Sequence, residues 1–230
     1  MKTIGLLGGM SWESTVTYYE VLNREIGKRL GGLHSARVLL LSVDFQQIET
    51  LQHEGKWDKL GEILAREAAT LERAGADFLV LATNTMHLVA PAMEEAVSIP
   101  LLHIADATAR RIEDSGIRSI GLLGTRFTME KPFYRGRLEE RHGLEVVVPA
   151  PEDREVIHRV IYEELVLGKI LPESRREYQR IVQALQDEGA EGVILGCTES
   201  GLLLNQTDTQ LPLFDTALIH AQAAAEFALL

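Results

Sequence analysis

Cysteine is the residue that this sequence most nearly lacks, since Cys197 is the only one among 230 residues. A single thiol excludes an internal disulfide and favours a reducing compartment. Basic side chains are also scarce, with 23 Lys and Arg against 34 Asp and Glu and a net charge of −11. This balance argues against nucleic acid or an anionic membrane as partner. An anionic small substrate remains compatible, because the field inside a pocket differs from the global sum.

Long apolar runs are absent as well. No stretch approaches the roughly 20 apolar residues that span a bilayer. The apolar run in residues 1–14 is shorter than the core of a signal peptide, and Trp12 and Glu13 interrupt it. We therefore expect a soluble cytoplasmic protein. Its 46% hydrophobic and 25% charged residues are ordinary for a globular chain of one large or two small domains.

The chain repeats itself internally. Three segments recur in the same order at a nearly constant offset: Ile4-Gly-Leu-Leu-Gly at Ile120, Ala74-Gly-Ala-Asp at Glu188, and Ile99-Pro-Leu-Leu at Leu211. Such a match predicts two copies of one α/β unit, each about half of the chain.

Each copy alternates short apolar strands with helical patterns. In the first copy, strands are expected near Thr3–Leu7 and Val38–Val43, and a long amphipathic helix near Asp58–Ala74. This order predicts parallel sheets with right-handed crossovers. We expect a first domain of residues 1–105 plus 211–230, because the Ala-rich last helix is expected to cross back, and a second of residues 106–210. No linker separates them, which predicts close docking around a cleft.

Polar side chains end two corresponding strands of the repeat. Thr83-Asn84-Thr85 end a strand in the first copy, and Cys197-Thr198-Glu199 end its counterpart. Ligands bind at such strand ends in open parallel sheets. If a pseudo-two-fold axis relates the copies, Thr83 and Cys197 face each other across the cleft, a geometry for moving a proton between two faces of a ligand. The alternatives are packing for the cysteine and helix capping for Thr and Asn.

The segment Gly5-Leu-Leu-Gly8-Gly9 is expected between a strand and a helix. Its amides could hold a carboxylate or phosphate at the helix N-terminus, or the glycines could serve a tight turn with positive φ. Dinucleotide-binding and P-loop spacings are absent. Thr125, the counterpart of Gly9, could add a hydroxyl to the cleft.

Several other chemistries find no support in the spacing. His87, His103 and His220 follow strand-like segments, but they do not have the spacing of a zinc site. No Gly-x-Ser-x-Gly elbow of a serine hydrolase is present. Nothing implies pyridoxal phosphate, which requires a Schiff-base lysine and a phosphate cup. We expect neither a metal nor a cofactor.

The motifs together resemble the aspartate/glutamate racemase family, with the enterobacterial amino-acid racemases as the most similar subgroup. The resemblance covers essentially the whole chain and rests on five segments: Gly5–Ser14, Ser42–Phe45, Thr83–His87, Gly121–Thr125 and Gly196–Glu199. It implies a cofactor-independent enzyme of two Rossmann-like halves, with the site between them and a homodimeric assembly.

The family mechanism uses two cysteines, one on each face of the α-carbon. Cys197 matches the second, whereas Thr83 stands where the first would be. A thiol ionises near pH 8.5, but a threonine hydroxyl is a far weaker acid. We therefore expect an asymmetric reaction, in which Cys197 deprotonates the L-amino acid and Thr83, or a water that it positions, returns a proton to the other face.

The resemblance also assigns residues that bind the amino-acid substrate: Met10, Gln52, Asn84, Thr85, Thr125, Thr198 and Glu199. Aspartate-specific relatives are expected to have basic side chains near positions 52 and 164, where this chain has Gln52 and Glu164. This departure favours broader or neutral substrates.

Two other functions stay open at this point. One is a decarboxylase or isomerase of the same superfamily, in which a single cysteine protonates a carbanion. The other is a non-catalytic protein that binds a small ligand. Isotope exchange at the α-carbon distinguishes the racemase from both.

Overall fold

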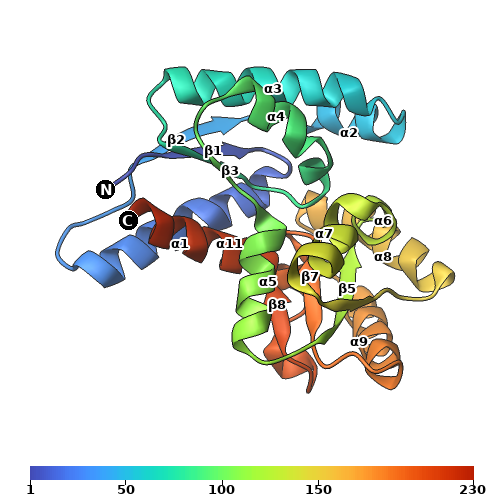
Figure 1. The fold of residues 1–230 in the computed structure, drawn as a ribbon. Coiled ribbons are helices and arrows are strands. Elements are labelled where there is room, and N and C mark those ends of the chain that lie inside the picture. Colours follow the sequence, from blue (N-terminus) through green and yellow to red (C-terminus); the bar gives the residue numbers. More distant parts are fainter. The chain divides into compact units, whose positions relative to one another are not determined.

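The computed structural model describes residues 1–230, which divide into two units. The first unit contains residues 1–103 and 220–230, and the second contains residues 104–219. Each unit is built on its own four-stranded parallel sheet flanked by helices (Figure 1). The predicted α/β class with parallel sheets is therefore confirmed.

The sheet of the first unit has the order β2-β1-β3-β4. Its strands are β1 (Ile4–Gly8), β2 (Val38–Ser42), β3 (Phe78–Leu81) and β4 (Leu101–Leu102). The two inner strands, β1 and β3, are buried along their whole length. Both faces of these strands are covered, which is why their sequences read as continuous apolar runs rather than as alternating patterns.

Helices cover both faces of this sheet. They are α1 (Trp12–Leu30), α2 (Phe45–His53), α3 (Trp57–Arg73), the 3-10 turn η1 (Thr85–Val89) and α4 (Ala90–Ala96). Figure 1 shows α3 and α4 on one face and α1 on the other. The end of α11 (Thr216–Ala228) also packs here, with the Phe227 ring 4.8 Å from that of Phe78.

The second unit repeats the topology, with the strand order β6-β5-β7-β8. Its strands are β5 (Ser119–Gly124), β6 (Glu145–Val147), β7 (Val193–Gly196) and β8 (Leu213–Asp215). Its helices are α5 (Ile104–Asp114), α6 (Arg126–Glu130), α7 (Pro132–His142), α8 (Pro151–Glu163), η2 (Leu165–Leu167), α9 (Pro172–Asp187), α10 (Ser200–Leu203) and η3 (Gln206–Asp208). None of the helices in the chain combines the length and apolar character that crossing a membrane requires.

The boundary between the units differs from the expected one. We expected residues 211–230 to join the first domain, but β8 pairs with β7 in the second sheet, with Val193 opposite Leu213. This pairing matches that of β4 with β3, so it follows from the repeat itself. As a result α11 begins in the second unit and ends in the first.

The glycines that follow the long helices of the repeat have the expected conformation. Gly75 follows α3 and Gly189 follows α9, and each has φ +98°. A left-handed residue of this kind closes a helix, and glycine adopts it without steric cost.

Candidate functional site

The residues expected in the first half of the site lie at the carboxyl edge of the first sheet. Met10 follows β1 and Thr83 follows β3, and these two strands are hydrogen-bonded neighbours. Gln52 reaches the same region from α2, where its Nε2 lies 2.9 Å from the sulfur of Met86. All five expected residues are buried: Met10, Gln52, Thr83, Asn84 and Thr85.

A cluster of buried histidines lies directly behind Thr83. His87 Nδ1 is 2.7 Å from the Thr83 carbonyl oxygen, and the His87 ring centroid is 4.4 Å from that of His103. His220 lies 6.0 Å from His87 between centroids and is hydrogen-bonded to Tyr18 Oη and the Leu102 carbonyl oxygen. Spacing along the chain did not predict this cluster, because η1, β4 and α11 meet only in the folded unit.

Burial determines the charge state of one of these rings. His220 is fully buried, and desolvation lowers its pKa to about 4 despite the hydrogen bond to Leu102. His220 is therefore neutral at pH 7. It acts as a structural link between α11, α1 and β4.

The glycine turn after β1 is a tight turn with positive φ. Gly9 has φ +90°, and a Cβ at this position would lie 2.4 Å from the Val43 carbonyl oxygen. The Gly9 amide donates to Thr15 Oγ1 at 2.8 Å. This amide is therefore already used within the turn, so it does not face an anion.

The residues expected in the second half of the site lie at the carboxyl edge of the second sheet. Cys197 follows β7 and Thr125 follows β5, and these strands pair with Gly124 opposite Gly196. The Cys197 thiol donates to Glu199 Oε2 at 3.1 Å, and Thr198 Oγ1 donates to the same oxygen at 2.8 Å. All four side chains are buried.

The environment of Cys197 disfavours its thiolate. Burial raises the pKa of the thiol well above its usual value, and the charge of Glu199 raises it further. The Glu199 backbone amide and the Ser200 hydroxyl, which are donors near the sulfur, oppose this shift of the pKa. The thiol is therefore neutral near pH 7, and its hydrogen bond to Glu199 Oε2 makes that oxygen the nearest acceptor for its proton.

A second carboxylate lies close to Glu199. Asp215 ends β8, and a Cβ on Gly201 would displace the Asp215 carboxylate from its present position. Burial and then the charge of Glu199 raise the pKa of Asp215, although it accepts the Leu218 amide at 3.1 Å. Sequence reasoning missed Asp215 because it lies on a different strand from the cysteine motif.

Thr125 and Glu164 have local partners in the second unit. Thr125 is the N-cap of α6, where its Oγ1 accepts the Thr128 amide at 3.3 Å. Glu164 follows α8 and accepts a hydrogen bond from Ser174 Oγ. A capping hydroxyl that already faces a helix amide has less freedom to bind a substrate.

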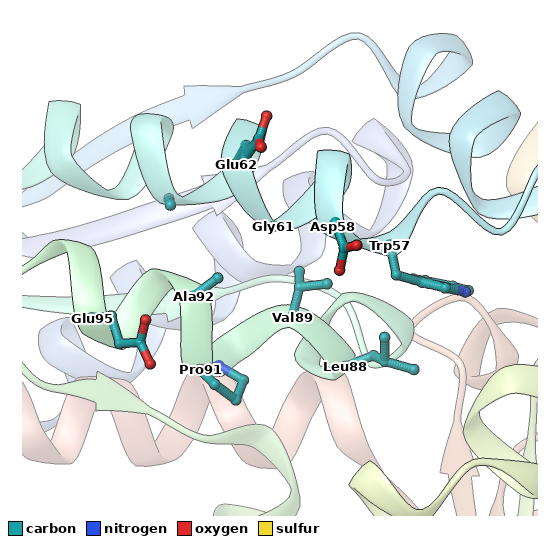
Figure 2. A pocket seen from close by; sticks show the side chains of 10 residues that line it. Trp57, Asp58, Gly61, Glu62, Leu88, Val89, Pro91, Ala92 and Glu95 are labelled. Carbon is teal, nitrogen blue, oxygen red and sulfur yellow. The ribbon is translucent and has the colours of Figure 1, made fainter.

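A groove in the first unit is separate from these residues. It encloses about 450 Å³ between α3 and α4, and Figure 2 shows the side chains that line it. Its floor is apolar, with Val89 and Ala92, and its rim carries three carboxylates: Asp58, Glu62 and Glu95. None of the site residues predicted from the sequence lines this groove, so the strand ends are the better candidate site.

Comparisons with known proteins place the chain in a family. The sequence model of the family described as Asp/Glu/Hydantoin racemase matches residues 7–224. The chain is 24% identical over 232 residues to the broad specificity amino-acid racemase of Bacillus subtilis, and the match covers 96% of this chain and 95% of that protein.

Two crystal structures are similar over their whole length. A protein of Yersinia pestis assigned as an Asp/Glu racemase is 54% identical with a TM-score of 0.93, and an aspartate racemase homologue from Pyrococcus horikoshii is 39% identical with a TM-score of 0.83. Both matches cover 100% of each chain. The chain therefore belongs to the Asp/Glu/hydantoin racemase family of isomerases.

Proposed function

We propose that this chain is a cofactor-independent amino-acid racemase in which Cys197 and Thr83 act on opposite faces of the α-carbon. The observation that carries the proposal is the buried Cys197–Glu199 hydrogen bond at the end of β7. The end of β3 corresponds in the repeat to the end of β7, and Thr83 at the end of β3 is as buried as Cys197. A proton donor and acceptor pair at one strand end and a hydroxyl at the other suit proton transfer at carbon.

The reaction begins with the thiol. Its proton passes to Glu199 Oε2, across the existing 3.1 Å contact, and the thiolate then removes the α-proton of the L-amino acid. The substrate ammonium adds a positive charge beside the carboxylates of Glu199 and Asp215. This positive charge favours the negatively charged thiolate of Cys197.

The reaction ends on the Thr83 side. The Thr83 hydroxyl, or a water that it positions, donates a proton to the opposite face of the carbanion. Solvent then returns a proton to that oxygen, and Glu199 releases the thiol proton to solvent. The reverse direction requires a threonine alkoxide, which is far less accessible than a thiolate. We therefore propose that the maximal rate of conversion from L to D is much higher than that from D to L. Because the equilibrium constant between enantiomers is one, KM for the L-enantiomer is then higher in the same proportion.

The polar residues around the two strand ends hold the substrate. Asn84, Thr85 and Thr198 bind the α-carboxylate and ammonium, and Met10 and Gln52 contact the rest of the molecule. Because Gln52 and Glu164 carry no positive charge, we propose that substrates extend beyond aspartate and glutamate to neutral side chains such as homoserine. The broad specificity in the name of the Bacillus subtilis relative supports this breadth.

The decisive experiment is isotope exchange. The protein is incubated in D₂O with L- and D-aspartate, L-glutamate and L-homoserine, and α-deuterium is followed by NMR. We expect exchange from the L-enantiomers in the wild type and none in Cys197→Ser. The proposal fails if no substrate gains deuterium and Cys197→Ser behaves like the wild type. Sedimentation tests the proposed homodimer, and cell fractionation tests the proposed cytoplasmic location.

The neutral thiol also favours a second candidate function. A protonated Cys197 is a proton donor, as a decarboxylase with a single cysteine requires. This enzyme releases CO₂ from a malonate-type substrate and leaves one product proton derived from the thiol. Carbon dioxide release without α-exchange of amino acids supports this alternative.

A further inference from the structure

Two fully buried hydroxyls lie beside Cys197 and have no role in the reaction described above. Tyr178 belongs to α9, and Ser200 is the first residue of α10. Neither Tyr178 Oη nor Ser200 Oγ has a partner with good hydrogen-bond geometry while the thiol donates to Glu199. Burying a hydroxyl without a partner is costly, so native proteins keep such groups where another state uses them.

The two hydroxyls and the sulfur lie within reach of one another. The Ser200 amide donates to the Cys197 carbonyl oxygen at 2.9 Å, which fixes Ser200 next to the thiol. The Ser200 hydroxyl lowers the pKa of both Cys197 and Tyr178, and the charge of a Cys197 thiolate raises the pKa of Tyr178. Ser200 therefore lies between the sulfur and the phenol.

The other groups that face this cluster are acidic. Glu199 contacts the sulfur, Asp215 interacts with Glu199, and Glu164 raises the pKa of Tyr178. These carboxylates disfavour a thiolate. Besides the Glu199 backbone amide, the Ser200 hydroxyl is the group in the second unit that favours the charged sulfur by hydrogen bonding.

We propose that Tyr178 and Ser200 are positioning residues that form a donor chain to Cys197 when the thiolate appears. Tyr178 Oη–H donates to Ser200 Oγ, and Ser200 Oγ–H donates to Cys197 Sγ. The thiol proton goes to Glu199, and neither hydroxyl loses its own proton. Both hydroxyls lack a hydrogen-bond partner in the resting state, so forming these two hydrogen bonds breaks no existing one. The whole free energy of the new hydrogen bonds therefore stabilises the thiolate state.

The role of the donor chain in catalysis rests on the proposed function, but the effect of the donor chain on the pKa of the thiol is measurable without substrate. Cys197 is the only cysteine, so alkylation by iodoacetamide reports on this thiol alone. The alkylation rate is measured from pH 6 to 11 in the wild type, Tyr178→Phe and Ser200→Ala. We expect the thiol pKa to rise by about one unit in both variants, with alkylation about tenfold slower at pH 8.

Two further variants serve as controls. Tyr134 is another fully buried tyrosine of the second unit whose hydroxyl lacks a partner of good geometry, but Cys197 does not affect its pKa, so Tyr134→Phe is expected to leave the profile unchanged. Ser200→Thr keeps a hydroxyl and is expected to restore most of the wild-type profile. Circular dichroism identifies folded variants, and either Tyr178→Phe or Ser200→Ala suffices if the other does not fold.

The outcomes separate this proposal from the racemase proposal. Unchanged alkylation profiles in folded Tyr178→Phe and Ser200→Ala overturn the donor chain, as does an equal shift in Tyr134→Phe. If the profiles shift as expected but no amino acid gains α-deuterium, the donor chain stands and the racemase proposal fails.

Discussion

The Cys197 thiol donates a hydrogen bond to Glu199 Oε2 at 3.1 Å, so the residue proposed as the base still holds its proton in the ground state. Glu199 has two opposing effects on it. Its negative charge raises the pKa of the thiol, yet its oxygen is the nearest acceptor for the thiol proton. Glu199 is therefore expected to act in the proton transfer as well as in substrate binding.

Glu199→Gln is expected to separate these two effects. Without the negative charge the thiol pKa falls, so iodoacetamide alkylation at pH 8 becomes faster. Without the proton acceptor, α-deuterium exchange of an L-amino acid slows by about 10²-fold or more. Glu188→Gln, at an exposed position of the same unit, is the control and is expected to change neither rate. Parallel changes in both rates would contradict the dual role.

Thr83→Cys is expected to raise the turnover of the D-enantiomer. A thiol on the second face is a far stronger acid than a hydroxyl, so a thiolate becomes available to deprotonate the D-enantiomer. Exchange of D-aspartate or D-glutamate in D₂O is expected to rise by about 10²-fold. Thr83→Ser keeps a hydroxyl and should retain the wild-type asymmetry. Equal exchange of both enantiomers in the wild type would refute the asymmetry.

His220 is expected to make stability depend on pH. The unfolded chain protonates this residue below about pH 6.5, whereas the folded protein does so only below about pH 4. The stabilising contribution is thus fully present above pH 6.5 and decreases as the pH falls toward 4, by at most about 1.4 kcal/mol per pH unit.

Urea unfolding at pH 7 and pH 4.5 measures this contribution. In His220→Gln the loss of unfolding free energy between the two pH values is expected to be smaller than in the wild type by about 2 kcal/mol. His34→Gln removes an exposed histidine and is expected to keep the wild-type difference. A wild-type pH dependence in His220→Gln would exclude His220 as its source.

Gly9→Ala is expected to destabilise the turn after β1. The new Cβ would lie 2.4 Å from the Val43 carbonyl oxygen, at a residue with φ +90°. Strain and clash together are expected to cost about 2 kcal/mol or more. Gly116 also has positive φ, but no atom lies within 4 Å of the position that its Cβ would take, so Gly116→Ala should cost only about 1 kcal/mol. Chemical denaturation gives both values, and equal costs would show that the contact with Val43 is unimportant.

Much of the fold was predictable because it depends on local patterns and on the repeat. The strand predicted near Thr3–Leu7 is β1 (Ile4–Gly8), and the helix predicted near Asp58–Ala74 is α3 (Trp57–Arg73). Apolar periodicity and helix-closing glycines are properties of neighbouring residues, so they can be read from one segment at a time.

The surroundings of the site residues were less predictable, because they depend on segments that meet only in the folded units. Asp215 reaches Glu199 from another strand, and Tyr178 reaches Ser200 from the buried face of α9. The motif around Cys197 identified a candidate nucleophile, but its raised pKa arises from burial and from the Glu199 carboxylate.

The two units become complete at different times during synthesis. Residues 104–219 form the second unit as one continuous segment, whereas the first unit also requires residues 220–230, which the ribosome makes later. Until then Phe78 lacks its contact with Phe227, and Tyr18 lacks His220. The first unit to be translated is therefore the last to be finished, and the apolar surface that α11 covers stays exposed to aggregation until this helix has been made.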